Sequence, residues 1–248
     1  MVEFLETSAG RRIAYHLTDG RGPAVVFLGG FMSDMEGSKA TYLEDWAKSQ
    51  GRAYLRFDYS GHGQSSGDFV EGAIGDWFAD AKEAIERLTK GRQVLVGSSM
   101  GGWISFLCAK AMSERIAGLV TIAAAPDFTE DGFYADFSDA EKAQLENEGV
   151  VNVPSDYGDP YPITKRLIED GRDHFIMRDR LEFEFPVRML QGTEDSAVTR
   201  ETALGLLDHL NVEDLRLTFV KGSDHSLSNA DNLRMIVAAI EDVLDRIE

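Results

Sequence analysis

A serine lies at the centre of the most informative stretch of the chain, RQVLVGSSMGGW, residues 92–103. Gly97, Ser99 and Gly101 form a G-x-S-x-G pattern between an apolar run typical of a buried strand and a periodic run typical of a helix. A strained turn between a strand and a helix can lift a serine hydroxyl clear of its neighbours, as in a nucleophile elbow. The pattern predicts Ser99 as the nucleophile of an acyl transfer, and a plain helix N-cap serine is the alternative.

A second G-x-S-x-G pattern runs from Gly63 to Gly67 and has Ser65 at its centre. Ser65 lies several residues beyond an apolar strand, and the polar Asp68 follows the pattern where a helix would have to begin. Because this context lacks the strand, turn and helix of an elbow, we expect Ser65 to be structural.

A serine hydroxyl needs an imidazole to remove its proton, and the imidazole works best when a carboxylate orients it. On a parallel sheet the acid and then the histidine are expected after the serine, each just beyond a strand. His225 follows the predicted strand Leu215–Val220 and precedes the last helix, so we predict it as the general base. A loop or capping histidine is the alternative; the other histidines fit less well, and His62 precedes the serine.

The acid is expected after the strand Val187–Leu190, where the chain reads QGTEDSAV. We predict Asp195 for this role. Glu194 and Asp224 remain rivals, because an acid in a turn often bonds only its own backbone. Asp224 adjoins the histidine in sequence, which makes a hydrogen bond to Nδ1 harder to form.

Acyl transfer also needs two donors where the oxyanion develops. We predict that these are the backbone N–H groups of Met100, directly after the nucleophile, and of Phe31, in the loop after the run 24–28. Because backbone donors survive side-chain replacement, Phe31→Ala and Met100→Ala are expected to be mild.

The elements that must position these residues alternate between apolar strands and amphipathic helices, which indicates a parallel sheet covered on both faces. An N-terminal antiparallel hairpin is expected at Val2–Glu6 and Arg12–Leu17. We predict one α/β domain over residues 1–248, with a mostly parallel sheet of about eight strands.

The alternation stops at about residues 126–185, which we predict to be a small helical lid with helices at Ser138–Asn147 and near Ile163–Met177. Its aromatic residues either line an acyl pocket or simply pack; they are Phe128, Phe133, Tyr134, Phe137 and Tyr161. Its basic residues either meet a substrate carboxylate or form a solvated face; they are Lys165, Arg166, Arg172, Arg178 and Arg180.

Composition limits the partners. A formal charge of −18 disfavours nucleic acid and anionic membrane surfaces, and the single cysteine, Cys108, is expected to be a core residue. We expect neither a signal peptide nor a membrane span, and therefore a cytoplasmic protein. We also expect no metal or cofactor, a small-molecule acyl ester or thioester as the partner, and a monomer.

Three segments carry a resemblance to a known family. RFDYSGHGQSSG (56–67) resembles the structural D-x-x-G-x-G-x-S segment of the α/β-hydrolase superfamily. GGFMSDMEGSKA (29–40) and VGSSMGGW (96–103), with SDH before the last helix, resemble the mitochondrial α/β-hydrolase-domain acyl-protein thioesterases, which also cleave acyl glucuronides. The resemblance implies an α/β-hydrolase fold with a short lid and cleavage of esters or thioesters.

Two positions depart from the superfamily's pattern: Gly29-Gly30 stands where many members have His-Gly, and Thr199 where the acid loop often has proline. Residues and resemblance together predict a serine carboxylesterase or thioesterase for small to medium acyl groups, acting through an acyl-enzyme. A serine peptidase or an acyltransferase with the same three residues is the alternative, and a non-catalytic binding module is a more distant one.

Overall fold

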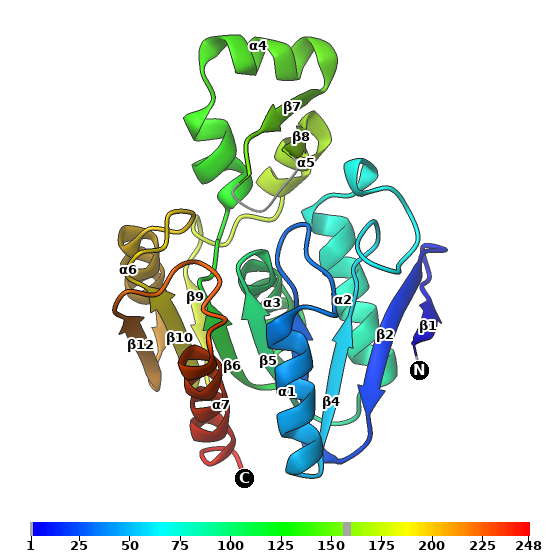
Figure 1. Cartoon of the computed structure of the whole chain (residues 1–248), viewed down its shortest axis with the longest axis vertical. Helices are drawn as coiled ribbons and strands as arrows, with labels where there is room; N and C mark the ends of the chain where they lie inside the picture. Colours follow the sequence, from blue (N-terminus) through cyan, green and yellow to red (C-terminus); the bar gives the residue numbers. More distant parts are fainter. Residues whose placement is uncertain (1, 156–159) are drawn as a thin grey trace.

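An eight-stranded sheet forms the centre of the molecule in the computed structural model, which describes residues 2–155 and 160–248 (Figure 1). Among the described strands of this sheet, only the pairs β1–β2 and β2–β4 are antiparallel, which confirms the predicted mostly parallel sheet and the N-terminal hairpin. In spatial order the strands are β1 (Glu3–Glu6), β2 (Arg12–Thr18), β4 (Arg52–Phe57), β3 (Arg21–Leu28), β5 (Gln93–Ser98), β6 (Ile116–Ile122), β10 (Val187–Gly192) and β12 (Leu215–Val220).

Helices cover both faces of this sheet, as the continuous apolar runs of the inner strands require. One face packs against α1 (Ser38–Ser49) and α7 (Ala230–Leu244). The other packs against α2 (Ile74–Leu88), α3 (Met100–Ala111) and α6 (Arg200–His209). Each inner strand supplies alternate side chains to the two cores. Because the inner strands run parallel, their carboxyl ends lie at one common edge of the sheet.

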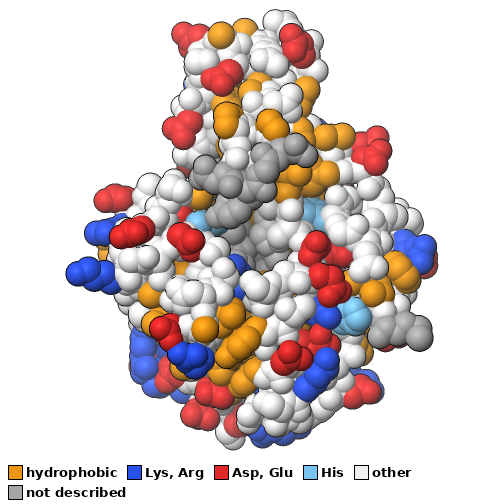
Figure 2. Space-filling view, viewed as in Figure 1, with side chains coloured by type: hydrophobic (Ala, Val, Ile, Leu, Met, Phe, Trp, Pro, Cys, Tyr) orange, Lys and Arg blue, Asp and Glu red, His pale blue; other side chains and the backbone are white. Residues whose placement is uncertain are grey.

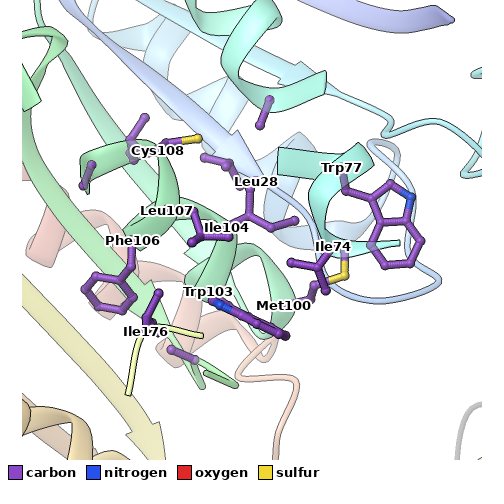
Figure 3. Packing of buried hydrophobic residues seen from close by; sticks show 14 of the residues in the cluster. Leu28, Ile74, Trp77, Met100, Trp103, Ile104, Phe106, Leu107, Cys108 and Ile176 are labelled. Atoms are coloured by element: carbon purple, nitrogen blue, oxygen red, sulfur yellow. The ribbon is translucent and has the colours of Figure 1, made fainter. Parts of the chain in front are cut away.

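Helix α3 is the most deeply buried helix next to that edge. Ten of its residues, Met100 to Ala109, are buried, so it is surrounded by apolar neighbours rather than amphipathic. Figure 3 shows Met100, Trp103 and Ile104 packed near Leu28 and Ile74. The start of α3 is thereby held against the end of β3.

Between β6 and β10 the chain forms a segment, residues 126–185. After a short π-helix (Thr129–Tyr134) it contains α4 (Asp139–Glu148), the antiparallel pair β7 (Val150–Val153) and β8 (Tyr161–Thr164), and α5 (Lys165–Arg172). The elements α4, β7, β8 and α5 stand above the common strand edge (Figure 1). The last strand of the segment, β9 (Leu181–Phe183), pairs with β11 (Leu210–Val212) in a small separate sheet.

The first helix predicted in this segment matches α4, where Ser138 and Glu141 form a reciprocal capping box. The second, predicted near Ile163–Met177, is shorter than predicted. Residues 161–164 pair as a strand, and the Thr164 hydroxyl then accepts from the Leu167 N–H at 3.0 Å, which caps α5 at its start. The β7–β8 hairpin had no counterpart in the prediction.

Hydrogen bonds fasten the α5 side of the segment to the body. The Gly75 N–H donates to Asp170 at 2.7 Å, and the Trp103 indole donates to the His174 carbonyl at 2.9 Å. The buried Asp127 carboxylate accepts from the N–H groups of Ile176 and Met177 at 2.9 and 3.0 Å. The beginning and end of the segment are therefore tied to each other.

Among the described residues, no helix is long and apolar enough to cross a membrane.

Trp103→Ala should lower the free energy of unfolding by about 3–5 kcal/mol, because it empties a fully buried site and removes the donor to His174. Trp46 is the matched control, since it is half-buried and its indole donates to Glu241 at the surface. Trp46→Ala should cost less than about 2 kcal/mol. Urea unfolding of the two variants measures both values, and equal losses would contradict the prediction.

Candidate active site

Ser99 occupies the turn between β5 and α3, with φ 55° and ψ −118°. A non-glycine residue at positive φ is strained, and such strain collects at functional sites. Three backbone hydrogen bonds hold the turn: the Ser99 N–H donates to Ile122 at 2.9 Å, and its carbonyl accepts from Gly102 and Ala125 at 2.9 and 3.2 Å. The strained serine is therefore fixed from both sides.

In the structure, the three side chains predicted for the acyl transfer form one chain of hydrogen bonds. Nε2 of His225 lies 3.0 Å from Ser99 Oγ, and its Nδ1 lies 2.9 Å from Asp195 Oδ2. Ser99 follows β5, Asp195 follows β10 and His225 follows β12, so three strand ends meet here. An imidazole in this position can take a proton from the serine while the carboxylate orients it.

The Asp195 carboxylate is fully buried and well satisfied. Burial raises its pKa, but the hydrogen bonds from His225 and from the Val198 N–H and the Gln191 amide outweigh burial, so its net pKa lies below the usual value. The group is thus an anion that faces His225.

The rival acids are placed differently. Glu194 is exposed, and its N–H donates to the Ser223 carbonyl. The Asp224 carboxylate accepts from the Ser226 and Leu227 N–H groups at 3.1 and 3.2 Å, within its own turn. Of the three acids, Asp195 is the one that contacts His225.

The sequence did not indicate two residues that contact Asp195 or the loop that carries His225. The buried Gln191 amide donates to Asp195 Oδ2 at 2.8 Å and to the Val198 carbonyl at 3.0 Å. Lys39 Nζ donates to the carbonyl of Ser226, the residue after His225, at 2.6 Å. Burial lowers the pKa of Lys39. No local pattern signals either contact, although a polar residue within a buried strand such as Gln191 is unusual.

Glycine lets the loop after β3 approach the serine. A Cβ placed on Gly30 would lie 3.4 Å from Ser99 Cβ, and one on Gly101 would overlap the carbonyl oxygen of Leu28. The first N–H groups of a helix have no partner within it. Among the described residues, neither the Met100 nor the Phe31 N–H donates to a protein acceptor, so both are available.

Two side chains from the 58–65 loop brace the chain after Phe31. The Met32 N–H donates to His62 Nε2 at 3.3 Å, and the Met35 N–H donates to Asp58 Oδ1 at 2.6 Å. Ser65, in the second G-x-S-x-G pattern, accepts from the Ala14 N–H at 2.8 Å and donates to the Asp58 carbonyl at 2.7 Å. These are the structural contacts expected of Ser65.

The ring of Phe31 lies among aromatic rings from three parts of the chain. Their centroids lie 4.9–6.0 Å from that of Phe31, and they belong to Phe69, Trp77, Phe128, Phe133 and Tyr161. All of these pairs except the tilted one with Phe133 are edge-to-face, a geometry that stabilises by about 0.5–1.5 kcal/mol for each pair. The expectation that Phe31→Ala is mild neglected this packing, because it considered only the backbone donor.

The basic residues of the 126–185 segment face acids. Arg178 contacts Asp131 at 2.6 Å, and Arg172 contacts Glu130 at 2.7 Å. Lys165, Arg166 and Arg180 contact Glu146, Asp76 and Glu182 in the same way. Figure 2 shows acidic side chains scattered over this face of the molecule. These ion pairs favour the second of the two alternatives, a solvated face, and a substrate carboxylate is not needed to explain the basic residues.

The eight-stranded sheet and the strand-end site are those of an α/β-hydrolase. Residues 22–146 match the Hydrolase_4 family, described as serine aminopeptidase, S33, and the chain belongs to this family. It is 33% identical to the mitochondrial palmitoyl-protein thioesterase ABHD10 of Bos taurus, over 99% of this chain and 81% of that protein.

Solved structures lead to the same family. A hydrolase from Agrobacterium vitis S4 is 36% identical with a TM-score of 0.93, and mouse α/β-hydrolase domain-containing protein 10 is 30% identical with a TM-score of 0.92. Each comparison covers all of both chains. The predicted fold class and the resemblance are thereby confirmed.

The predicted cytoplasmic location is wrong by the same comparisons. The curated relatives from Bos taurus, Rattus norvegicus and Pongo abelii are named as mitochondrial proteins. The prediction depended on the expected absence of a signal peptide and a membrane span, and that expectation does not determine the location.

Burial lowers the pKa of His62 to about 4. Between about pH 6.5 and 4 the unfolded chain binds a proton that the folded protein excludes at His62. The free energy of unfolding should therefore fall by about 3 kcal/mol as the pH drops through this window. His62→Gln cannot titrate and should lose this part of the slope. Urea unfolding from pH 4 to 7 measures it, and parallel curves for wild type and variant would refute the assignment.

Proposed function

We propose that this protein is a serine esterase or thioesterase that forms an acyl-enzyme on Ser99. The observation that carries the proposal is the unbroken line from Ser99 through His225 to Asp195, at 3.0 and 2.9 Å. A serine, an imidazole and a buried carboxylate in this order constitute the machinery of acyl transfer on many unrelated folds.

In the first step Ser99 Oγ attacks the acyl carbonyl carbon while His225 Nε2 takes the hydroxyl proton. The carbonyl oxygen becomes an oxyanion, which the N–H groups of Phe31 and Met100 stabilise. When the tetrahedral intermediate collapses, the bond to the leaving alcohol or thiol breaks, and His225 returns its proton to that group.

In the second step a water molecule attacks the acyl-enzyme carbonyl, and His225 takes one of its protons. Collapse releases the carboxylic acid and returns the proton to Ser99 Oγ. Asp195 stays ionised throughout, orients the Nδ1–H of His225 and stabilises the imidazolium. Its lowered pKa supports that role.

The choice of esters and thioesters is supported by the relatives named as palmitoyl-protein thioesterases. We propose a single domain over residues 1–248 in which residues 126–185 form the lid. The rings of Phe128, Phe133 and Tyr161 then form one apolar wall beside Phe31, suited to an acyl chain. Figure 2 shows hydrophobic side chains on the lower part of this segment.

Ser99→Ala should lower the turnover of p-nitrophenyl butyrate at least about 10³-fold and abolish labelling by a fluorophosphonate, because the attacking oxygen is lost. Ser65→Ala is the matched control from the second G-x-S-x-G pattern. It should keep the labelling and lose stability instead, since its hydroxyl bonds only backbone groups of the body.

Retained labelling of Ser99→Ala would rule out Ser99 as the nucleophile. Faster cleavage of an aminoacyl anilide than of the ester would favour a peptidase, and transfer to an added alcohol would favour an acyltransferase.

Asp195→Asn should lower kcat by roughly 10³–10⁴-fold, because the amide cannot stabilise the His225 imidazolium. Glu194→Gln and Asp224→Asn should each stay within about threefold of wild type, since neither carboxylate contacts His225. Steady-state kinetics with the same ester measure all three. A loss in Asp224→Asn as large as that in Asp195→Asn would exclude this assignment of the acid.

A further inference from the structure

We propose that His62 is a positioning residue that holds the oxyanion loop, residues 29–35, by accepting a hydrogen bond from the Met32 N–H. The inference rests on the proposed function, because it concerns the placement of the Phe31 donor. It assigns His62 a task in the reaction that its position before the serine had not suggested.

The hydrogen bonds of His62 define its tautomer. Nδ1 lies 3.1 Å from the Ser60 carbonyl, and a carbonyl can only accept, so Nδ1 carries the hydrogen. In the neutral ring Nε2 then has a free lone pair, and it faces the Met32 N–H at 3.3 Å. The ring is 4% exposed, so water offers little competition for either contact.

Aromatic neighbours keep the imidazole in this orientation. The rings of Trp77, Phe69 and Tyr59 lie 5.0, 5.1 and 5.7 Å from it, each nearly edge-to-face. Because the ring cannot turn without displacing them, the acceptor stays in place.

Hydrogen bonds hold both peptide groups that flank Phe31, the one with Gly30 and the one with Met32. The Gly30 carbonyl accepts from the Ser33 N–H at 3.2 Å and from the Ser33 hydroxyl at 2.8 Å. In a trans peptide the N–H points opposite to the carbonyl, so this contact directs the Phe31 N–H the other way. The bond from Met32 to His62 holds the next plane.

Burial alone does not hold this part of the loop. The Met32 side chain is 43% exposed, and its φ of 53° lies in the strained left-handed region. Without an acceptor for its N–H, Met32 can relax toward negative φ, and the peptide group between Phe31 and Met32 then turns. The donor would then be displaced from the developing oxyanion, which affects the transition state more than substrate binding.

Two variants separate the hydrogen bond from the packing. His62→Phe keeps an aromatic ring but has no acceptor, whereas in His62→Gln the amide oxygen can accept from Met32 and the NH₂ group can donate to Ser60. For p-nitrophenyl butyrate, His62→Phe should lower kcat roughly 10–100-fold with KM within about twofold, since one oxyanion donor is worth about 10²–10³. His62→Gln should regain most of the loss.

His16→Phe is the control, since His16 is a half-buried histidine on β2 that contacts Glu36. Its kcat should stay within about twofold of wild type. Wild-type kcat in His62→Phe would overturn the inference, and so would an equal loss of kcat in His62→Gln and His62→Phe.

A second readout does not depend on turnover. In ¹⁵N-histidine-labelled wild-type protein, His62 should be the neutral tautomer with the hydrogen on Nδ1 between pH 6 and 8. The Met32 amide should exchange with solvent faster in His62→Phe than in wild type, and His62→Gln should regain most of the protection. A hydrogen on Nε2 would overturn the inference even if His62→Phe does not fold. Absence of ester turnover in wild type would instead overturn the proposed function.

Discussion

The site depends on a close approach of two backbones, the end of β3 and the first turn of α3. A Cβ on Gly101 would overlap the Leu28 carbonyl oxygen, and one on Gly97 would overlap that of Gly101. Only glycine permits this distance. Because the two segments meet here, the loop that begins at Gly29 lies beside the serine, as the proposed oxyanion donors Phe31 and Met100 require.

This approach has an energetic cost, since Ser99 sits at a φ of 55° that costs on the order of 1–3 kcal/mol. The surrounding structure offsets the cost in two ways. Three hydrogen bonds hold the turn backbone, and α3 behind it is buried along most of its length. The same rigidity keeps Ser99 Oγ in line with His225, which is the preorganisation that acyl transfer requires.

The sheet and the positions of Ser99, Asp195 and His225 were predictable, because strand ends and elbow glycines leave local patterns in the sequence. The antiparallel pair of β7 and β8 was not, because strands of four residues show too little alternation to be recognised. Contacts such as Gln191 with Asp195 and His62 with Met32 join side chains to distant segments, and no local pattern encodes them. Cellular location was missed because composition carries little information about it.

Phe31 links the chemistry to the 126–185 segment. Its N–H is the proposed oxyanion donor, and its ring packs on Phe128, Phe133 and Tyr161 of that segment. The same ring packs on Phe69 and Trp77, which also contact the ring of His62. A shift of the segment that moved the ring would therefore also move the N–H. The bond from Met32 to His62 opposes that movement from the body side, which is the role proposed for His62.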